Sequence, residues 1–345
     1  MMDSVRLLVT TIPGLEDVTV AEASEKLSLK SFEVKPGQVA GRVILEVSEE
    51  EASKVFRLRS IEHVIRLLKI FPVEASLKGL DTIYRELYGL EVELGSTFRI
   101  TCERVGSHDY TSIDVQRVAG QALVDRYGTK VNLKNPETIV RVDVAREWCF
   151  VGVQLTRQPL HIRYLRVFQH PSALNPVIAY GMLRLSGLKS GETLLDAFCG
   201  GGTIIIEAAQ AWENLEALGI DISPKNIEGA WKNAESAGVK DKVNFMVADA
   251  CRLERFLPEG WKADREVSNL PFGIRSGRLK ALPKIYRGFL SSVKSFLSRS
   301  AMLCLLTARR NILESSALEE GYEVAEARKI AYGGLESWII RLKPP

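Results

Sequence analysis

Short apolar runs alternate with longer amphipathic stretches through the second half of the chain. Apolar runs bounded by turn residues predict buried strands, and apolar positions recurring every three or four residues predict helices. The predicted strands are residues 194–196, 219–222, 243–247, 267–269 and 301–307, and the predicted helices are 177–185, 204–209, 223–237 and 282–297. Strands separated by helices predict an α/β domain around a mostly parallel sheet. Residues 322–330 and 337–342 predict an antiparallel pair that closes it.

The first half of the chain mixes strands and helices in a different order. The predicted strands are residues 5–11, 43–47, 97–104, 131–133, 138–145 and 149–155, and the predicted helices are 16–27, 49–59, 81–87 and 112–127. Here strands follow one another as often as they alternate with helices, which predicts α+β architecture.

Composition adds a few constraints. A length of 345 residues predicts two or three domains, and 46% hydrophobic with 26% charged residues is ordinary for globular chains. No apolar run is long enough to span a membrane, and the N-terminus lacks a signal-peptide pattern. We therefore expect an intracellular, cytoplasmic protein.

Charge and cysteine usage are mild. The net charge of +3 permits nucleic-acid binding without arguing for it, so any basic surface must be local. The five cysteines are scattered, and no CxxC pair or His/Cys cluster predicts a metal site.

A turn of three glycines, Gly200 to Gly202, joins the first strand of the α/β half to a helix, as in nucleotide-binding βα units. Asp196 stands at the strand end, where dinucleotide-binding folds carry glycine because phosphates lie against the helix N-terminus. A carboxylate repels phosphate and suits a cation. The pattern therefore favours S-adenosylmethionine, which has an ammonium group and a sulfonium but no phosphate.

Polar residues also stand at the ends of the next three predicted strands. Asp221 follows the second strand, where an acid takes ribose hydroxyls, and Asp249 follows the third, where it could meet the adenine amino group. Asn269 ends the fourth. A glycine turn or a single acid is weak alone, since acids often cap helices, but four such positions along one sheet edge favour a cofactor site.

The motif Asp196-x-Phe198-Cys199-Gly200-x-Gly202-Thr203, with Asn269-Leu270-Pro271-Phe272 downstream, resembles the class I amino-group methyltransferases. Among these, the chain is similar to the THUMP-domain tRNA guanine-N2-methyltransferases, and to the branch that acts at tRNA position 6. The resemblance extends over essentially the whole chain, because residues 13–16 and 58–64 are similar to the ferredoxin-like domain that precedes THUMP domains.

The resemblance implies a Rossmann-like methyltransferase domain preceded by ferredoxin-like and THUMP domains. The implied boundaries are 1–68 for the ferredoxin-like domain, 69–157 for the THUMP domain, 158–172 for a linker and 173–345 for the methyltransferase domain. It further implies a monomer that transfers methyl from S-adenosylmethionine to the N2 amine of a guanosine in the acceptor stem of tRNA. The residues expected to border the cofactor are Ala173, Leu174, Asp196, Phe198, Cys199, Gly200, Gly202, Thr203, Asp221, Ile222, Asp249, Ala250 and Asn269.

The predicted catalytic residues are Asn269, Leu270, Pro271 and Phe272. The side-chain oxygen of Asn269 and the backbone carbonyl of Leu270 could accept the two hydrogens of a base amine, while Phe272 stacks on the base. Pro271 restricts Leu270 to an extended conformation that aims this carbonyl outward. The family usually has proline in place of Leu270, and this departure leaves the choice among adenine, guanine and cytosine amines open.

RNA contacts are expected from arginines in both halves. The candidates are Arg99, Arg104, Arg117, Arg157, Arg163, Arg166, Arg275 and Arg278, with Arg126, Arg141 and Arg146 as further possibilities. Residues 157–166 interleave basic and aromatic side chains, as contacts to phosphates and bases require, although the same stretch could be a plain linker.

Other functions remain open at this point. The chain could methylate guanosine at tRNA position 10 or in another RNA, or it could be an RNA-binding protein with a degenerate catalytic domain. A DNA adenine or a protein glutamine amide would need the same amine chemistry, but an RNA-docking N-terminal half disfavours a protein substrate.

Overall fold

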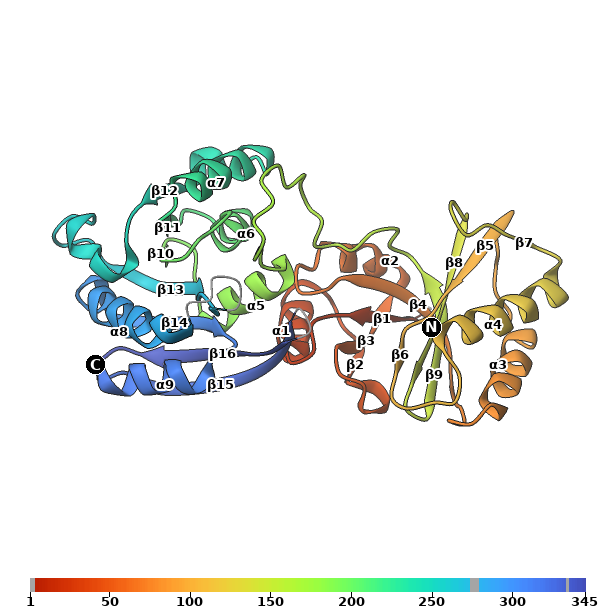
Figure 1. Ribbon diagram of the computed structural model, residues 1–345. Helices are drawn as coiled ribbons and strands as arrows, with labels where there is room; N and C mark the ends of the chain where they lie inside the picture. The colour runs from red at the N-terminus through yellow and green to blue at the C-terminus, as the bar shows by residue number, and fades with distance from the viewer. Residues whose placement is uncertain (1–3, 274–278, 333–334) are drawn as a thin grey trace. The chain divides into compact units, whose positions relative to one another are not determined.

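The computed structural model describes residues 4–273, 279–332 and 335–345, and its contacts divide the chain into two units (Figure 1). The first unit comprises Met1–Thr11 and Thr19–Leu160, and the second comprises Ile12–Val18 and His161–Pro345. A short segment near the N-terminus therefore belongs to the unit that the second half of the chain builds.

The second unit is a seven-stranded sheet in the order β12-β11-β10-β13-β14-β16-β15. Its strands are β10 (Thr193–Asp196), β11 (Glu216–Asp221), β12 (Asn244–Val247), β13 (Ala263–Asn269), β14 (Leu297–Thr307), β15 (Glu323–Tyr332) and β16 (Leu335–Lys343). Strands β10 to β14 pair in parallel, and β16 is antiparallel to both β14 and β15. The predicted Rossmann-like α/β fold with a closing antiparallel pair is confirmed.

Helices cover both faces of this sheet, as a parallel sheet requires. They are α5 (Pro176–Ser186), α6 (Thr203–Ala211), α7 (Pro224–Ser236), α8 (Leu282–Val293) and α9 (Arg310–Glu319). Buried side chains of α5, α6 and α7 form one hydrophobic cluster with the sheet, and those of α8 and α9 form another. Asn175 and Ser223 cap α5 and α7, and proline follows each cap.

The segment Ile12–Val18 contributes to the first of these clusters. Leu15 is buried there, and a Cβ on Gly181 of α5 would lie 2.7 Å from it. Arg328 of β15 donates to the Gly14 carbonyl at 3.1 Å and pairs with Asp17 at 2.5 Å. The segment is thus held by apolar burial and by an ion pair.

The first unit is built on one mixed sheet in the order β2-β3-β1-β4-β9-β8-β5-β7, with β6 paired to β8. Its elements are β1 (Ser4–Thr10), α1 (Glu16–Lys26), β2 (Ser31–Val34), β3 (Arg42–Ser48), α2 (Glu49–Ala52), β4 (His63–Pro72), α3 (Lys78–Tyr88), β5 (Thr97–Thr101), β6 (Arg104–Val105), α4 (Ser112–Tyr127), β7 (Lys130–Val131), β8 (Thr138–Ala145) and β9 (Trp148–Gln154). Strand β4 pairs with β1 and with β9, so the predicted boundary at 68/69 falls inside one strand that two subregions share.

Several predicted elements differ in detail. The helix predicted over 49–59 ends at Ala52 and continues as a 3₁₀ turn, and the helix predicted over 282–297 ends at Val293, so that β14 begins at Leu297. Strand β2 was not predicted, although its four residues, Ser31 to Val34, alternate polar and apolar side chains; all four are exposed. Four residues is the shortest alternation that predicts a strand. Helix α9 was not predicted either. None of the helices in the described residues has the length and apolar character needed to cross a membrane.

Candidate active site

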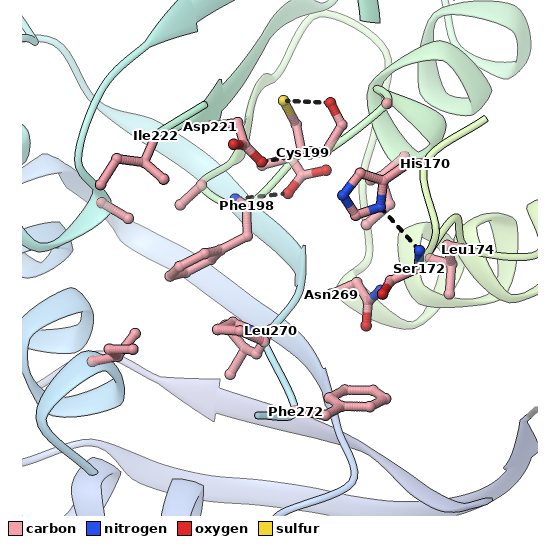
Figure 2. Close-up of a pocket in the computed structure, with 18 of the residues that line it drawn as sticks. His170, Ser172, Leu174, Phe198, Cys199, Asp221, Ile222, Asn269, Leu270 and Phe272 are labelled. Atoms are coloured by element: carbon pink, nitrogen blue, oxygen red, sulfur yellow. Dashed lines mark hydrogen bonds between the residues drawn. The ribbon is translucent and has the colours of Figure 1, made fainter. Parts of the chain in front are cut away.

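A cavity of about 630 Å³ opens at the carboxyl ends of β10, β11 and β13 (Figure 2). Ligands of open α/β sheets bind at this edge, where the strand order reverses around the first strand. The turns after these strands and the segment before α5 form its walls. The fold therefore brings together residues that lie far apart in the sequence.

The glycine turn after β10 is shaped by its backbone. Gly200 and Gly202 have φ angles of +51° and +82°, which favour glycine. The Cys199 amide donates to the Ile220 carbonyl at 2.8 Å, and the Gly202 amide donates to the Cys199 carbonyl at 2.8 Å. A Cβ on Gly202 would lie 2.8 Å from the Phe245 ring, so this glycine also permits close packing of the turn.

Asp196 lies at the floor of the cavity and is almost fully buried. Its Oδ1 accepts from the Phe198 amide at 3.2 Å and from the Ser268 hydroxyl at 3.0 Å. Burial raises the pKa of Asp196 to about 7, while these two hydrogen bonds act in the opposite direction. The carboxyl can thus gain or lose a proton near neutral pH.

Asp221, at the end of β11, is held by three donors. Its Oδ1 accepts from the Ser223 amide at 2.8 Å and from the Asn226 side chain at 3.0 Å, and its Oδ2 accepts from the Gly200 amide at 3.1 Å. The neighbouring Ile222 is 71% exposed and lines the cavity. A fixed carboxylate beside an exposed apolar side chain suits a ligand with both hydroxyl groups and an apolar ring.

The turn after β13 carries the predicted catalytic residues, and all four line the cavity. Figure 2 places Asn269 and Phe272 on the same segment, across the cavity from Asp221. The Asn269 Oδ1 atom is buried and accepts no hydrogen bond from any residue that the structure describes. An orphaned buried oxygen at a cavity wall is costly unless a ligand supplies a donor.

Three contacts fix the course of this turn. The Leu270 amide donates to the Leu306 carbonyl at 3.0 Å, and the buried Tyr286 hydroxyl donates to the Pro271 carbonyl at 2.8 Å. Arg309 Nε donates to the Phe272 carbonyl at 3.4 Å. No described residue occupies the Leu270 carbonyl in this way, so it is left to accept from a ligand.

The predicted cofactor residues lie around the cavity, with one difference. All of them line it except Gly202, whose position is explained by packing against Phe245. Sequence reasoning did not nominate His170, Ser172, Cys251, Leu282 and Ile285, which also line it. Leu282 and Ile285 belong to the apolar face of α8, and the helical spacing of apolar residues there predicts only that they are core residues. Their binding roles stay predictions.

Four of the predicted RNA-contacting arginines contact other groups of the protein through their guanidinium groups. Arg163 forms two contacts of 2.9 Å with the buried Glu207, and Arg166 donates to the Leu174 carbonyl at 3.3 Å. Arg99 donates to the Leu133 carbonyl at 3.2 Å and Arg104 to the Gly106 carbonyl at 3.0 Å.

Among the other main candidates, Arg117 is exposed although it pairs with Asp114 at 3.4 Å, and Arg157 is exposed, whereas Arg275 and Arg278 lie outside the described residues. Of the further candidates, Arg141 pairs with Asp143 at 2.8 Å and with Glu103 at 2.8 Å, as part of a network that also holds Arg42. Exposed guanidinium groups are the more available for phosphates, so Arg117 and Arg157 are the stronger remaining candidates. Within the described ranges, no group of three or more His, Cys, Asp or Glu side chains could hold a metal ion.

Comparisons with known proteins agree with this arrangement. A family model described as UPF0020, an RMKL-like methyltransferase domain, matches residues 163–337, and a THUMP-domain model matches residues 78–154. A tRNA (guanine(6)-N2)-methyltransferase of Archaeoglobus fulgidus is 34% identical, over 97% of this chain and 91% of its own length.

A protein of the same description from Thermus thermophilus is 35% identical over 94% of this chain and 96% of its own length. The crystal structure of TrmN from Thermus thermophilus superposes with a TM-score of 0.84 at 32% identity, covering 99% of this chain and 100% of that one.

Proposed function

The chain belongs to the family of THUMP-domain tRNA guanine-N2-methyltransferases, and from this premise we propose that it methylates the N2 amine of guanosine 6 in tRNA with S-adenosylmethionine as donor. The observation that carries the proposal is the orphaned Oδ1 of Asn269 at the wall of the cavity. A buried acceptor that awaits a donor matches an amine substrate.

The residues around the cavity fit the methyl donor. The volume of about 630 Å³ lies within the usual range for small-molecule sites. Asp221 can still accept from ribose hydroxyls, since a carboxylate has about four acceptor positions and three are used here. Exposed Ile222 offers an apolar surface for adenine, and Asp196 offers a carboxyl to the positive charges. Bound there, S-adenosylmethionine would supply a methyl group on a positively charged sulfur.

The chain's own residues prepare the amine. The lone pair of the guanine N2 atom is spread into the ring, so the amine is a poor nucleophile until its geometry changes. Asn269 Oδ1 accepts one amine hydrogen and the Leu270 carbonyl accepts the other, which draws the nitrogen toward a tetrahedral shape. Fixed acceptors of this kind lose little reorganisation energy at the moment of reaction.

Positioning supplies the rest. Phe272 stacks on the base, a contact of about 1–3 kcal/mol for each base stacked. Tyr286 donates to the Pro271 carbonyl and Arg309 donates to the Phe272 carbonyl, so the conformation of the turn is fixed before the base binds. A paired base cannot reach this cavity, so the nucleotide must leave its stack, and correct placement lowers the barrier further.

The finer features belong to the same proposal. We propose that the THUMP region docks the acceptor end of tRNA through exposed basic residues such as Arg117 and Arg157, and that one chain suffices for activity. A cytoplasmic compartment fits a tRNA substrate.

The test is methyl transfer to defined transcripts. Purified protein, labelled S-adenosylmethionine and a tRNA with guanosine at position 6 should yield N2-methylguanosine on nucleoside analysis. A transcript with a compensated base-pair change at position 6 should lose the product, and one changed at position 10 should keep it. Methylation that follows position 10, or an N6-methyladenosine product, would contradict the proposal.

A further inference from the structure

Two buried carboxyl groups lie on either side of one serine beneath the cavity. Ser268 Oγ is 3.0 Å from Oδ1 of Asp196, and it also forms a short hydrogen bond with Oε1 of Glu266. The same Oγ accepts from the Ala197 amide at 2.9 Å. Asp196 lines the cavity, whereas Glu266 stands in register with Leu195, a residue of the hydrophobic cluster formed with α8 and α9.

All three side chains are inaccessible to solvent or nearly so. Glu266 and Ser268 are 0% exposed and Asp196 is 1% exposed. The second carboxyl oxygen of Glu266 finds no hydrogen-bond partner among the described residues. Neither carboxyl forms an ion pair with a described Lys or Arg, so no buried cation balances them.

The other titratable groups near the pair are carboxyl, thiol and phenol groups, apart from one histidine that lines the cavity. Asp196 faces Cys199 on its own turn and Asp221 from β11, and Asp249 and His170 line the same cavity. Glu266 faces Cys304 of β14 and Tyr322, which precedes β15. Two ionised carboxylates in this setting would repel each other and lose their hydration.

The number of available hydrogens decides which group donates in each contact of Ser268 Oγ. A serine hydroxyl has one hydrogen and two lone pairs, so Ser268 cannot donate to both carboxyls. A protonated Glu266 donates to Ser268 Oγ, the Ala197 amide takes the other lone pair, and the single hydrogen of Ser268 points to Asp196. This arrangement uses the one hydrogen and both lone pairs of Ser268 Oγ, and it leaves Oε2 of Glu266 without a partner among the described residues.

We propose that Glu266 stays neutral and orients the Ser268 hydroxyl, so that this hydroxyl donates its hydrogen bond to Asp196. Asp196 then releases a proton to solvent when the cationic methyl donor binds in the cavity. The inference rests on the proposed function and names two positioning residues, Glu266 and Ser268, that do not touch the ligand. In this proton release, the O–H bond of Asp196 breaks, the electron pair of that bond stays on the carboxylate, and a water molecule takes the proton.

The electrostatics agree with this assignment. Burial raises the pKa of Asp196 to about 7 and raises the pKa of Glu266 well above its usual range. A cation placed beside Asp196 favours its charged form and lowers that pKa. Below the pKa of free Asp196, binding therefore competes with a proton, and affinity should rise by up to about tenfold per pH unit.

Calorimetric titration of the full chain with S-adenosylmethionine, in buffers of different ionisation enthalpy, measures the proton directly. At pH 7 we expect release of about half a proton per molecule bound, declining toward zero above pH 8. Asp196→Asn should bind without proton release and without the pH dependence. Binding with no release between pH 6 and 8 in the unmodified protein would overturn the inference alone, whereas no binding at any pH would overturn the proposed cofactor and the inference with it.

Two variants and one control test the two positioning residues. Ser268→Ala removes the donor to Asp196, so the pH midpoint of cofactor affinity should move upward. Ser337→Ala is its control, because Ser337 is an equally buried hydroxyl of the same sheet, and no described residue hydrogen-bonds to its side chain. Glu266→Gln keeps a donor for Ser268 and should leave the release unchanged. Loss of the release in Glu266→Gln would identify Glu266 as the titrating group and refute the assignment.

Discussion

At the residue scale, the distinguishing feature of the cavity wall is a side-chain amide oxygen without a hydrogen-bond partner among the described residues. A buried acceptor costs about 1–3 kcal/mol when it stays unsatisfied, and Asn269 Oδ1 is such an atom among the described residues. Elsewhere in the cavity wall, carboxyl oxygens of Asp196 and Asp221 are supplied with donors by their own turns. The unsatisfied atom is therefore where a substrate amine contributes most.

Asn269→Ala should reduce kcat by about a hundredfold or more, the scale seen when one pre-positioned hydrogen-bonding group is removed from a transition state. Cofactor affinity should stay close to normal, because Asp221 and the glycine turn are untouched. Single-turnover methyl transfer and calorimetry separate the two effects. Asn244→Ala, at the exposed start of β12, is the control. A near-normal rate for Asn269→Ala would exclude the acceptor role.

Tyr286 acts one step away from the chemistry. Its hydroxyl donates to the Pro271 carbonyl at 2.8 Å and lies 3.0 Å from the Thr307 hydroxyl. Tyr286→Phe should lower kcat by about tenfold, with a smaller change in KM, since the turn loses one of its fixed points. Tyr322→Phe deletes another buried hydroxyl, which donates to the Leu290 carbonyl at 2.8 Å, and should lose stability only. Equal kcat for the two variants would argue against positioning by Tyr286.

At the element scale, the strand–turn–helix unit of β10 and α6 depends on glycine for two separate reasons. Gly202 adopts a left-handed backbone and also abuts the Phe245 ring. Gly238, which follows α7, has a similar φ of +69°, but a Cβ added there would meet nothing within 4 Å. Comparing substitutions at Gly202 and Gly238 therefore separates the cost of backbone strain from the cost of a steric clash.

Gly202→Ala should therefore destabilise the protein by more than Gly238→Ala. The second change costs about 1 kcal/mol for the positive φ, and the first adds about 1–3 kcal/mol for overpacking against Phe245 and Ala230. Denaturant unfolding of both variants measures the difference. Equal losses would mean that the ring moves aside without cost.

At the scale of the whole molecule, each unit has its own sheet and core, but the chain does not visit them in simple order. Ile12–Val18 leaves the first unit, packs in the second, and returns. Leu15 and the Asp17–Arg328 pair are therefore lost in any fragment that begins after the THUMP region. Such a fragment would have a damaged core, so its failure to methylate tRNA would not by itself demonstrate an RNA-docking role for residues 1–157.

Buried acids also give the whole molecule a pH-dependent stability. The pKa of Glu266 rises from an unfolded value of 4.5 to well above it in the folded state, so the native chain holds more protons than the unfolded chain. The stability from this group is full below pH 4.5 and is lost as pH rises through the folded pKa, by up to about 1.4 kcal/mol per pH unit. Glu266→Gln should flatten that decline in unfolding experiments between pH 5 and 8. An unchanged slope would show that Glu266 is ionised in the folded protein.

The sequence by itself determined the α/β class, the glycine turn and the polar strand ends, because periodicity and turn chemistry are local properties of the chain. The motifs at Asp196 and Asn269, together with the pattern at residues 13–16 and 58–64, predicted the family, and the comparisons confirm it. The same local reasoning missed β2, a short strand of four exposed residues. The cofactor role of Gly202 stays a prediction, and the structure shows this glycine packed against the Phe245 ring.

Tertiary structure alone decided which distant residues meet. Three contacts show this: Ser268 bridges Asp196 and Glu266, Tyr286 supports Pro271, and Arg163 pairs with Glu207. Each joins segments that lie apart in the sequence. Burial is likewise a property of the packed molecule, and burial is what raises the pKa of Asp196 to about 7 and leaves the Asn269 oxygen orphaned. Local sequence fixes the conformations available to each segment, whereas the charge state and hydrogen bonds of a site depend on what the fold places beside it.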